Sequence, residues 1–124
     1  MAVLGLLNNK HIPKIYLRAS YRQRLELLRG LMDSDGSVNS LRKQCIFTNC
    51  NYNLIKDVHE LLLTLGQRPS IHEYIAEIKE IDYKTIAYNV TFRPIDIIPF
   101  LLPRKINKIN FKVNPVKVWH GNNK

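Results

Sequence analysis

The sequence predicts an α+β fold built on a four-stranded antiparallel sheet, and three observations lead to this class. Residues 21–33 and 54–65 repeat leucine and other apolar residues at the spacing of a helix with one buried face. Residues 85–93 alternate between large apolar side chains and smaller or polar ones, as a half-buried strand does. Weaker strand patterns within residues 37–48 and 69–78 give the order helix–strand–strand–helix–strand–strand–helix.

The first helix, over about residues 21–33, opens with a capping box. Ser20 can accept a hydrogen bond from a first-turn amide, and Gln23 can reach back to the main chain of Ser20. The apolar stripe that follows consists of Leu25, Leu27, Leu28, Leu31 and Met32. We therefore expect this helix to pack through one face against the sheet.

Between the two long helices the sequence holds a weak strand and then a better one over residues 44–48, joined around Leu41 and Arg42. A polar break precedes the second helix, which we expect to end at Gly66, a common helix stop. Both strands and the helix are ordinary elements of an α+β core.

The cleanest strand covers residues 85–93. The side chains expected to face the helices are Ile86, Tyr88, Val90 and Phe92. Pro94, Pro99 and Pro103 follow this strand, so the chain after it can form only short helical pieces, predicted around residues 97–102 and 106–109.

Charge is distributed unevenly along the 124 residues, which carry 19 Lys and Arg against 10 Asp and Glu. Basic side chains dominate residues 1–32 and residues 97–124, and the latter range contains no acid. Two basic ends around a mixed centre favour a polyanionic partner such as nucleic acid. We interpret residues 1–124 as one domain with a basic tail over about residues 110–124.

Two cysteines are too few for a disulfide scaffold, so we expect a reducing, cytoplasmic environment. Cys45 and Cys50, taken with His59 and His72, match no common zinc spacing, and we interpret both cysteines as packing residues. No apolar run reaches membrane-spanning length, so a membrane partner is not expected.

Residues 28–36, with the sequence LRGLMDSDG, break several local rules in one place. Gly30 interrupts a helical pattern at a cost of about 1 kcal/mol relative to alanine. Asp33 and Asp35 put carboxylates at a helix C-terminus, where the helix dipole disfavours each by about 0.3–1 kcal/mol. No lysine or arginine occurs between Asp33 and Arg42 to offset these charges. Rules broken together indicate a functional site.

Two carboxylates beside exposed main-chain carbonyls form an oxygen-rich site of the kind that Mg²⁺ or Ca²⁺ prefers. An EF-hand is excluded because, counted from Asp33, its fifth and sixth positions hold Ser37 and Val38. The basic surface argues against glycoside hydrolysis by a carboxylate pair. No nucleophilic serine motif and no glycine-rich phosphate loop is present. Metal-assisted phosphodiester cleavage fits the motif best.

The motif carries a family resemblance. Residues 28–36 resemble the signature of the LAGLIDADG (dodecapeptide) homing endonucleases, and residues 10–13 resemble the approach to it in the endonuclease domains of inteins. Residues 47–50 and 99–105 resemble later segments of the same domains. The resemblance implies an αββαββα half whose saddle-shaped sheet lies in the major groove of double-stranded DNA. It also implies site-specific DNA cleavage that depends on Mg²⁺ or another divalent cation.

Site residues follow from the resemblance position by position. Asp35 would be the catalytic metal ligand, and Ser34 would offer its main-chain carbonyl to the same ion. Asp33 would cap and position the helix end, while Gly30 would let a partner helix approach closely. The stretch thus combines a half-site for metal with a helix interface.

Two further residues complete the implied catalytic set. Asn49 matches the position of a polar residue that holds water, and Lys105 matches the basic residue near the scissile phosphate, with Arg104 as the alternative. Only one motif is present, so the chain resembles either the second half of a two-motif enzyme or a single-motif enzyme that works as a homodimer. No terminal His-Asn follows, and we do not expect this chain alone to splice protein.

The alternation of residues 85–93 also predicts how DNA is read. Side chains turned away from the helices could contact base edges, whereas Lys108, Lys112 and Lys117 would contact phosphates. The residues expected to bind DNA are Arg42, Gln44, His72, Asn89, Thr91, Arg93 and Lys112. Two alternatives stay open: a DNA- or RNA-binding module without cleavage, including an RNA maturase, and a structural domain.

Overall fold

The structure is a computed structural model that describes residues 12–113. Its helices and strands, in chain order, are η2 (Lys14–Arg18, 3₁₀), α2 (Tyr21–Asp35), β1 (Gly36–Asn39), β2 (Gln44–Asn49), α3 (Tyr52–Thr64), β3 (Ser70–Ile78), η3 (Lys79–Ile81, 3₁₀), β4 (Tyr83–Phe92) and α4 (Pro103–Ile106). This order confirms the predicted α+β class. Residues 10 and 11 of the predicted approach and Lys117 lie outside the described residues.

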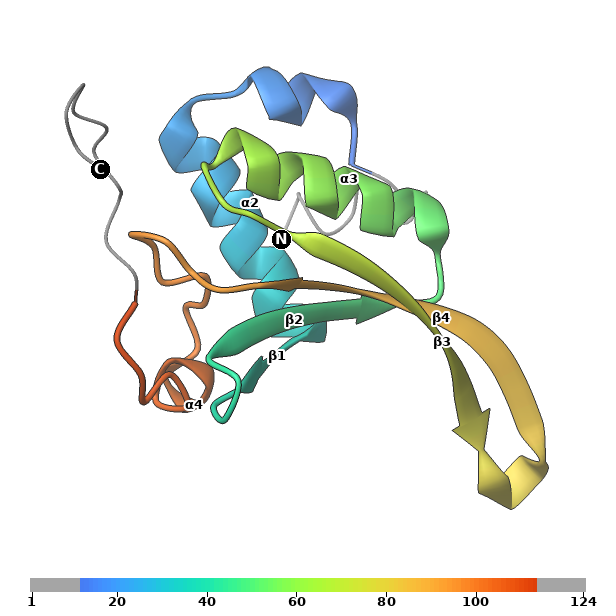
Figure 1. The fold of residues 1–124 in the computed structure, drawn as a ribbon. Coiled ribbons are helices and arrows are strands. Elements are labelled where there is room, and N and C mark those ends of the chain that lie inside the picture. Colours follow the sequence, from blue (N-terminus) through green and yellow to red (C-terminus); the bar gives the residue numbers. More distant parts are fainter. Residues whose placement is uncertain (1–11, 114–124) are drawn as a thin grey trace, which may run out of the picture.

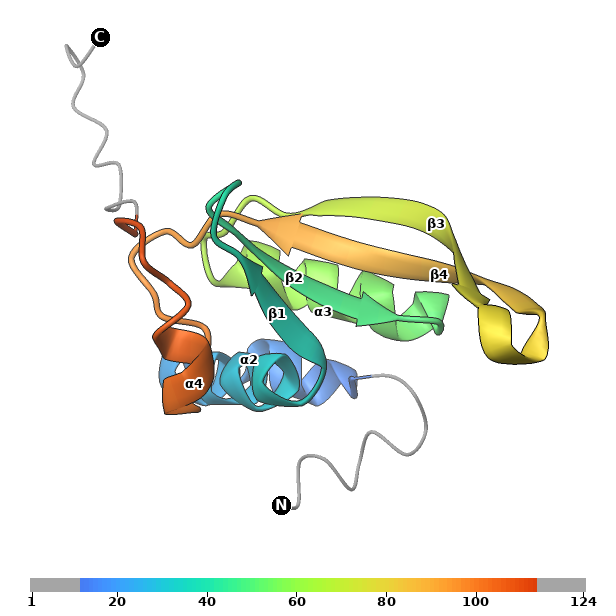
Figure 2. The same cartoon turned by 90° about the horizontal axis from the view of Figure 1, so that it is seen from below.

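The four strands form one antiparallel sheet in the order β1–β2–β4–β3. Helices α2 and α3 cover one face of this sheet (Figure 1). Viewed from below, the strands lie in front of both helices, which leaves the other face of the sheet open (Figure 2). Strands β3 and β4 continue as a long curved hairpin beyond the helix layer (Figure 1). No helix within residues 12–113 is long and apolar enough to cross a membrane.

The core lies between the two long helices and the sheet. Its members from α2, β2, α3 and β4 include Leu28, Leu31, Met32, Cys45, Phe47, Ile55, Val58, Leu62, Val90 and Phe92. Each large apolar side chain stabilises the fold by about 1.5–3 kcal/mol when fully buried. The stripe predicted for the first helix is therefore the surface that holds α2 on the sheet.

The two cysteines differ in their surroundings. Cys45 is buried in the core, and burial raises the pKa of its thiol to about 12. It is an apolar packing residue, as predicted. Cys50 is exposed, so the prediction that it packs is wrong. It lies just beyond the end of β2, where the chain turns toward α3.

Helix α2 begins as predicted and ends later than predicted. The main-chain N–H of Gln23 donates to Ser20 Oγ at 3.2 Å, and that of Ser20 donates to Gln23 Oε1 at 3.2 Å, which is the capping box. The helix continues to Asp35 and passes directly into β1 at Gly36. A Cβ atom on Gly36 would lie 2.6 Å from the carbonyl oxygen of Met32. Gly36 is thus needed for close backbone contact at this junction.

Strand β4 starts at Tyr83 and is longer than the layer of helices above it. Val90 and Phe92 face the helices and are buried, as the alternation predicts, and Tyr88 packs against the core from its edge. Ile86 is 48 % exposed. The expectation that Ile86 is covered by the helices is wrong because it belongs to the projecting hairpin.

Residues 97–102 are irregular and do not form the predicted helix. Their main-chain groups bond to side chains of α2: Arg29 Nε donates to the carbonyl oxygen of Ile98 at 2.8 Å, and the Leu101 N–H donates to Asp33 at 3.0 Å. The short helix α4 begins only at Pro103, whose fixed φ suits a first helical position. The predicted piece over residues 106–109 is therefore displaced toward the N-terminus.

Candidate active site

The candidate site lies where α2 passes into β1. Asp35 is the last residue of α2, and its side chain is exposed. Gly36 pairs with Phe47 of β2, and Asn49 follows two residues further along that strand, so Asn49 and Asp35 lie at the same end of the sheet. Asn49 Oδ1 accepts a hydrogen bond from the N–H of Asn51 at 2.8 Å. The fold thus brings together two residues that the motif resemblance had selected separately.

Asp33 connects α2 to the start of α4. Its Oδ1 accepts hydrogen bonds from the N–H groups of Leu101 at 3.0 Å and Leu102 at 3.1 Å. Leu102 is the N-cap of α4, whose first N–H groups have no partner within the helix. The carboxylate also has the sign that a helix N-terminus favours. Asp33 therefore lies in the last turn of its own helix, as the sequence predicted, and also fixes the main chain that leads into α4.

Lys105 makes the reverse connection, from α4 to the end of α2. Its Nζ donates to three main-chain carbonyl oxygens: Met32 at 3.1 Å, Asp33 at 2.7 Å and Gly36 at 2.9 Å. The ammonium also lies 5.8 Å from the centre of the Phe100 ring. A cation at this place offsets the negative end of the helix dipole.

We call the bonds of Asp33 and Lys105 together the α2–α4 clasp. Lys105 is 9 % exposed, and burial, with the nearby charge of Arg104, lowers the pKa of its ammonium group. Its three N–H bonds are all donated to main-chain oxygens, so the clasp uses the full donor capacity of the ammonium. Arg104, the alternative basic residue, is exposed beside it.

The end of α2 offers only part of the ligand set that a metal ion needs. Asp35 supplies one exposed carboxylate, and the clasp occupies the carbonyl groups of Met32, Asp33 and Gly36 but not that of Ser34. These oxygen donors suit Mg²⁺. Within residues 12–113 no three His, Cys, Asp or Glu side chains converge as a metal site.

Two small residues of α2 lie at the edge of its buried stripe. Leu27, Leu28, Leu31 and Met32 are the buried residues of this helix. Gly30 and Ser34 stand four residues apart, and each follows a buried leucine by three residues, which places them side by side along one edge of that stripe. Gly30 is half-buried and Ser34 is exposed. These are the two small residues that the sequence predicted for helix pairing.

The open face of the sheet carries the side chains predicted to read bases. Strand register places Asn89 of β4 between Thr48 of β2 and His72 of β3, and because side chains alternate, all three point away from the helices. By the same register, Gln44 and Thr91 belong to this face. Asn89 Oδ1 is shielded there and has no hydrogen-bond partner within the described part of the chain.

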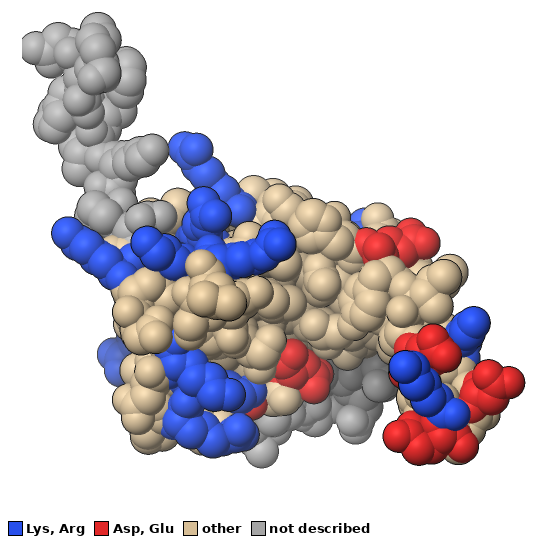
Figure 3. Space-filling view, turned by 60° about the horizontal axis from the view of Figure 1, so that its bottom comes forward, with Lys and Arg blue, Asp and Glu red and all other residues tan. Residues whose placement is uncertain are grey.

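Charge is separated along this face (Figure 3). Lys and Arg gather at one end of this face, and the projecting β3–β4 hairpin at the other end carries acids, among them Glu77 and Glu80, mixed with lysines (Figure 3). Arg42, Arg93 and Lys112 lie together at the basic end with Lys43, which sequence reasoning missed. The sequence pattern could not predict that Lys43 joins this basic end, because its position depends on the conformation of a tight turn.

The comparisons with known proteins agree with this geometry. The family model described as a LAGLIDADG-like domain matches residues 22–97. A protein named replicative DNA helicase DnaB, from Mycobacterium intracellulare, is 40% identical over 92 residues, which cover 74% of this chain and 16% of that protein. The chain thus spans a small part of that relative's length. With the motif helix, the sheet order and the matched range in agreement, the chain belongs to the LAGLIDADG-like domain family.

Proposed function

We propose that this chain is one half of a site-specific DNA endonuclease of the homing type, which hydrolyses phosphodiester bonds with a divalent cation. The observation that carries the proposal is the exposed carboxylate of Asp35, held at the end of a clasped helix beside an open sheet face. A domain that only bound DNA would have no use for an acid at this place, since the carboxylate repels phosphate.

The relative named as a DnaB helicase supports an intein-type setting. Helicase motors hold nucleotide phosphates in a glycine-rich loop, and this chain contains no such motif. A stretch of the endonuclease family that aligns with 16% of a helicase-named protein is what an endonuclease domain inserted in a host protein would give. Helicase activity is therefore no part of the proposal.

The proposed chemistry divides between the ion and the protein. A bound Mg²⁺ would polarise the scissile phosphate and make an attacking hydroxide available near neutral pH. Asp35 and the carbonyl of Ser34 would hold the ion, and Asn49 would orient water through its amide group. Lys105 is assigned to holding the helix end, because its N–H groups are already donated to carbonyl oxygens.

One chain supplies too few ligands for firm metal binding, so we propose that two motif helices pair, in a homodimer or with another LAGLIDADG half. Pairing along the stripe of Gly30 and Ser34 would bring two Asp35 carboxylates close together. Bound cations would relieve the repulsion between them.

Gly30→Leu is expected to break this pairing with little effect on the fold. The added side chain would separate the helices, while Gly30 is not one of the buried core residues of its own helix. Analytical ultracentrifugation should show loss of the dimer with unchanged helicity by circular dichroism.

Gly30→Ala is the matched variant for this experiment. It should raise the free energy of unfolding by up to about 1 kcal/mol through helix propensity, and it should pair better than the leucine variant. A Gly30→Leu protein that remains fully dimeric would place the interface elsewhere.

The function itself is tested by incubating the protein with a plasmid library of randomised target sites, with Mg²⁺ or with EDTA. Metal-dependent cleavage of a small set of related sequences supports the proposal. DNA binding without cleavage under any divalent cation would assign the chain to a binding module instead.

A further inference from the structure

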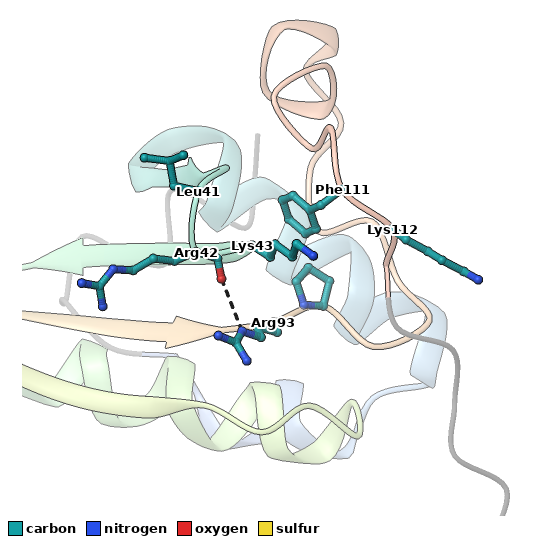
Figure 4. Close-up of a pocket in the computed structure, with 7 residues that line it drawn as sticks. Leu41, Arg42, Lys43, Arg93, Phe111 and Lys112 are labelled. Carbon is teal, nitrogen blue, oxygen red and sulfur yellow. Dashed lines mark hydrogen bonds between the residues drawn. The ribbon is translucent and has the colours of Figure 1, made fainter.

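A basic pocket lies at the end of the sheet, away from the motif. It has a volume of about 410 Å³ and is lined by Leu41, Arg42, Lys43, Arg93, Pro94, Phe111 and Lys112 (Figure 4). The turn between β1 and β2, the end of β4 and the segment after α4 each contribute part of the wall. Three distant segments thus contribute four cationic residues to the lining, and of these Lys43 points toward Phe111 while Arg42 and Lys112 turn their side chains outward (Figure 4).

The turn that forms the pocket is held in an unusual conformation. Lys43 has a φ of 57°, in the left-handed region that side chains other than glycine and asparagine rarely adopt. The Arg42 N–H donates to Asn39 Oδ1 at 3.1 Å, and Ser40 Oγ donates to the carbonyl oxygen of Lys108 at 2.6 Å, which ties the turn to the C-terminal segment. A lysine kept at a strained position indicates a use for its charge.

The cations of the pocket are not neutralised by acids. The ion pair found within residues 12–113 joins Arg22 to Glu26, far from this turn in the sequence. Arg93 Nε donates to the carbonyl oxygen of Arg42 at 3.3 Å, which orients the guanidinium without offsetting its charge (Figure 4). Phe111 and Pro94 add an apolar wall beside the cations.

We propose that this pocket binds a single backbone phosphate of duplex DNA, with the attached sugar against Phe111. The inference rests on the proposed DNA-binding function and adds a fixed anchor to it. Arg93, which the sequence argument assigned to base reading, belongs to this anchor. Lys43 and Arg93 are the cations placed to hold this phosphate, because the side chains of Arg42 and Lys112 point away from the hollow (Figure 4).

The distance between the pocket and Asp35 indicates where the anchored phosphate lies on the DNA. Asp35 precedes the first residue of β1 and the pocket lies beyond its last, so strand β1 separates them. Four strand residues span roughly 13 Å, which corresponds to about four base-pair steps along the duplex. The anchored phosphate therefore lies a few nucleotides from the bond to be cleaved.

The number of phosphates is measured by the salt dependence of binding. We would titrate a fluorescent 30-base-pair duplex of arbitrary sequence from 50 to 200 mM salt, in EDTA so that no cleavage occurs. Each phosphate neutralised contributes about −0.9 to the slope of log K against log salt, or about 3.5-fold in affinity across this range.

Lys43→Asn is the informative variant, because asparagine tolerates the left-handed conformation and removes the charge. It should leave thermal stability equal or higher and weaken DNA binding. The double variant with Arg93→Ala should lower the slope by about 0.9 in total. Lys84→Asn, on the far hairpin opposite Glu77, is the control of equal charge change and should leave the slope unaltered.

If the slope of log K against log salt is unchanged in the double variant, the pocket does not bind a phosphate. A fall of about 1.8 would mean that the two side chains contact separate phosphates on a surface rather than one in a pocket. Failure of the unaltered protein to bind the duplex at all would instead remove the proposed function. If the protein binds DNA and the slope falls as expected but no cleavage occurs, the phosphate anchor is supported and only the proposed nuclease activity is rejected.

Discussion

Asp35→Asn is expected to abolish metal-dependent cleavage, with a loss of about 10³-fold or more, because the charge stabilisation supplied by a bound cation is worth several kcal/mol. DNA affinity measured in EDTA should be equal or slightly higher, since the variant removes a negative charge facing phosphate. The fold should be unaffected because Asp35 is exposed at the last position of α2.

Asp82→Asn is the matched control for this experiment. Asp82 also ends a helical turn, has a φ of 50° that asparagine adopts readily, and lies on the hairpin away from the site. It should cleave DNA normally. Cleavage by Asp35→Asn at the normal rate would exclude Asp35 from metal binding, and a parallel loss of DNA affinity in EDTA would exclude the proposed division between binding and catalysis.

Local patterns were sufficient to predict most of the fold. The capping box at Ser20, the leucine stripe and the glycine after the second helix are signals read within a few residues, and the corresponding elements are present. Asn51 Oδ1 accepts from the Leu54 N–H at 3.1 Å, and Gly66 has a φ of 78°, as a helix stop requires. These features follow from chemistry that neighbouring residues determine.

The errors have a common physical cause in contacts between residues far apart in sequence. Residues 97–102 contain enough apolar side chains for a helix, but their main-chain groups bond to Arg29 and Asp33. Ile86 has the right alternation and lies outside the helix layer. Neither effect can be predicted from the local residue pattern.

The candidate site shows the same division. A broken local rule, carboxylates at the negative end of a helix, singled out Asp33 and Asp35 alike, and the family resemblance then assigned the metal to Asp35. The explanation for Asp33 lies in the segment just before α4, where it accepts hydrogen bonds from the N–H groups of Leu101 and Leu102. The apparent lack of a nearby cation is answered by Lys105, which approaches from a segment about seventy residues later in the chain.

Lys105→Met is expected to lower the free energy of unfolding by about 3 kcal/mol. Methionine can fill the space of the aliphatic stem, but the carbonyls of Asp33 and Gly36 lose the ammonium donor, and that of Met32 keeps only the N–H of Gly36. Buried groups left unpaired cost about 1–3 kcal/mol each. Cleavage should also fall, because the end of α2 that carries Asp35 loses its restraint. Calcium affinity, measured by calorimetry on the protein without DNA, should decrease in parallel.

This result separates two roles for Lys105. A lysine that only contacted the scissile phosphate could be replaced without loss of stability, since removing an uncompensated buried charge is neutral or stabilising. Arg104→Met removes the exposed neighbouring cation and should leave the unfolding curve unchanged. If the Lys105→Met protein is as stable as the unaltered chain but inactive, Lys105 takes part directly in catalysis.

The α2–α4 clasp also predicts that Asp33 and Lys105 stabilise the fold as one unit. Asp33→Ala frees the start of α4 and Lys105→Met frees the end of α2, so either change releases the same contact between the two helices. The double variant should therefore be less destabilised than the sum of the single variants, with a coupling of about 1–2 kcal/mol. Urea denaturation of the four proteins measures this cycle. Additive effects would show that the two sets of hydrogen bonds are independent, and Asp35 would then depend on Lys105 alone for its position.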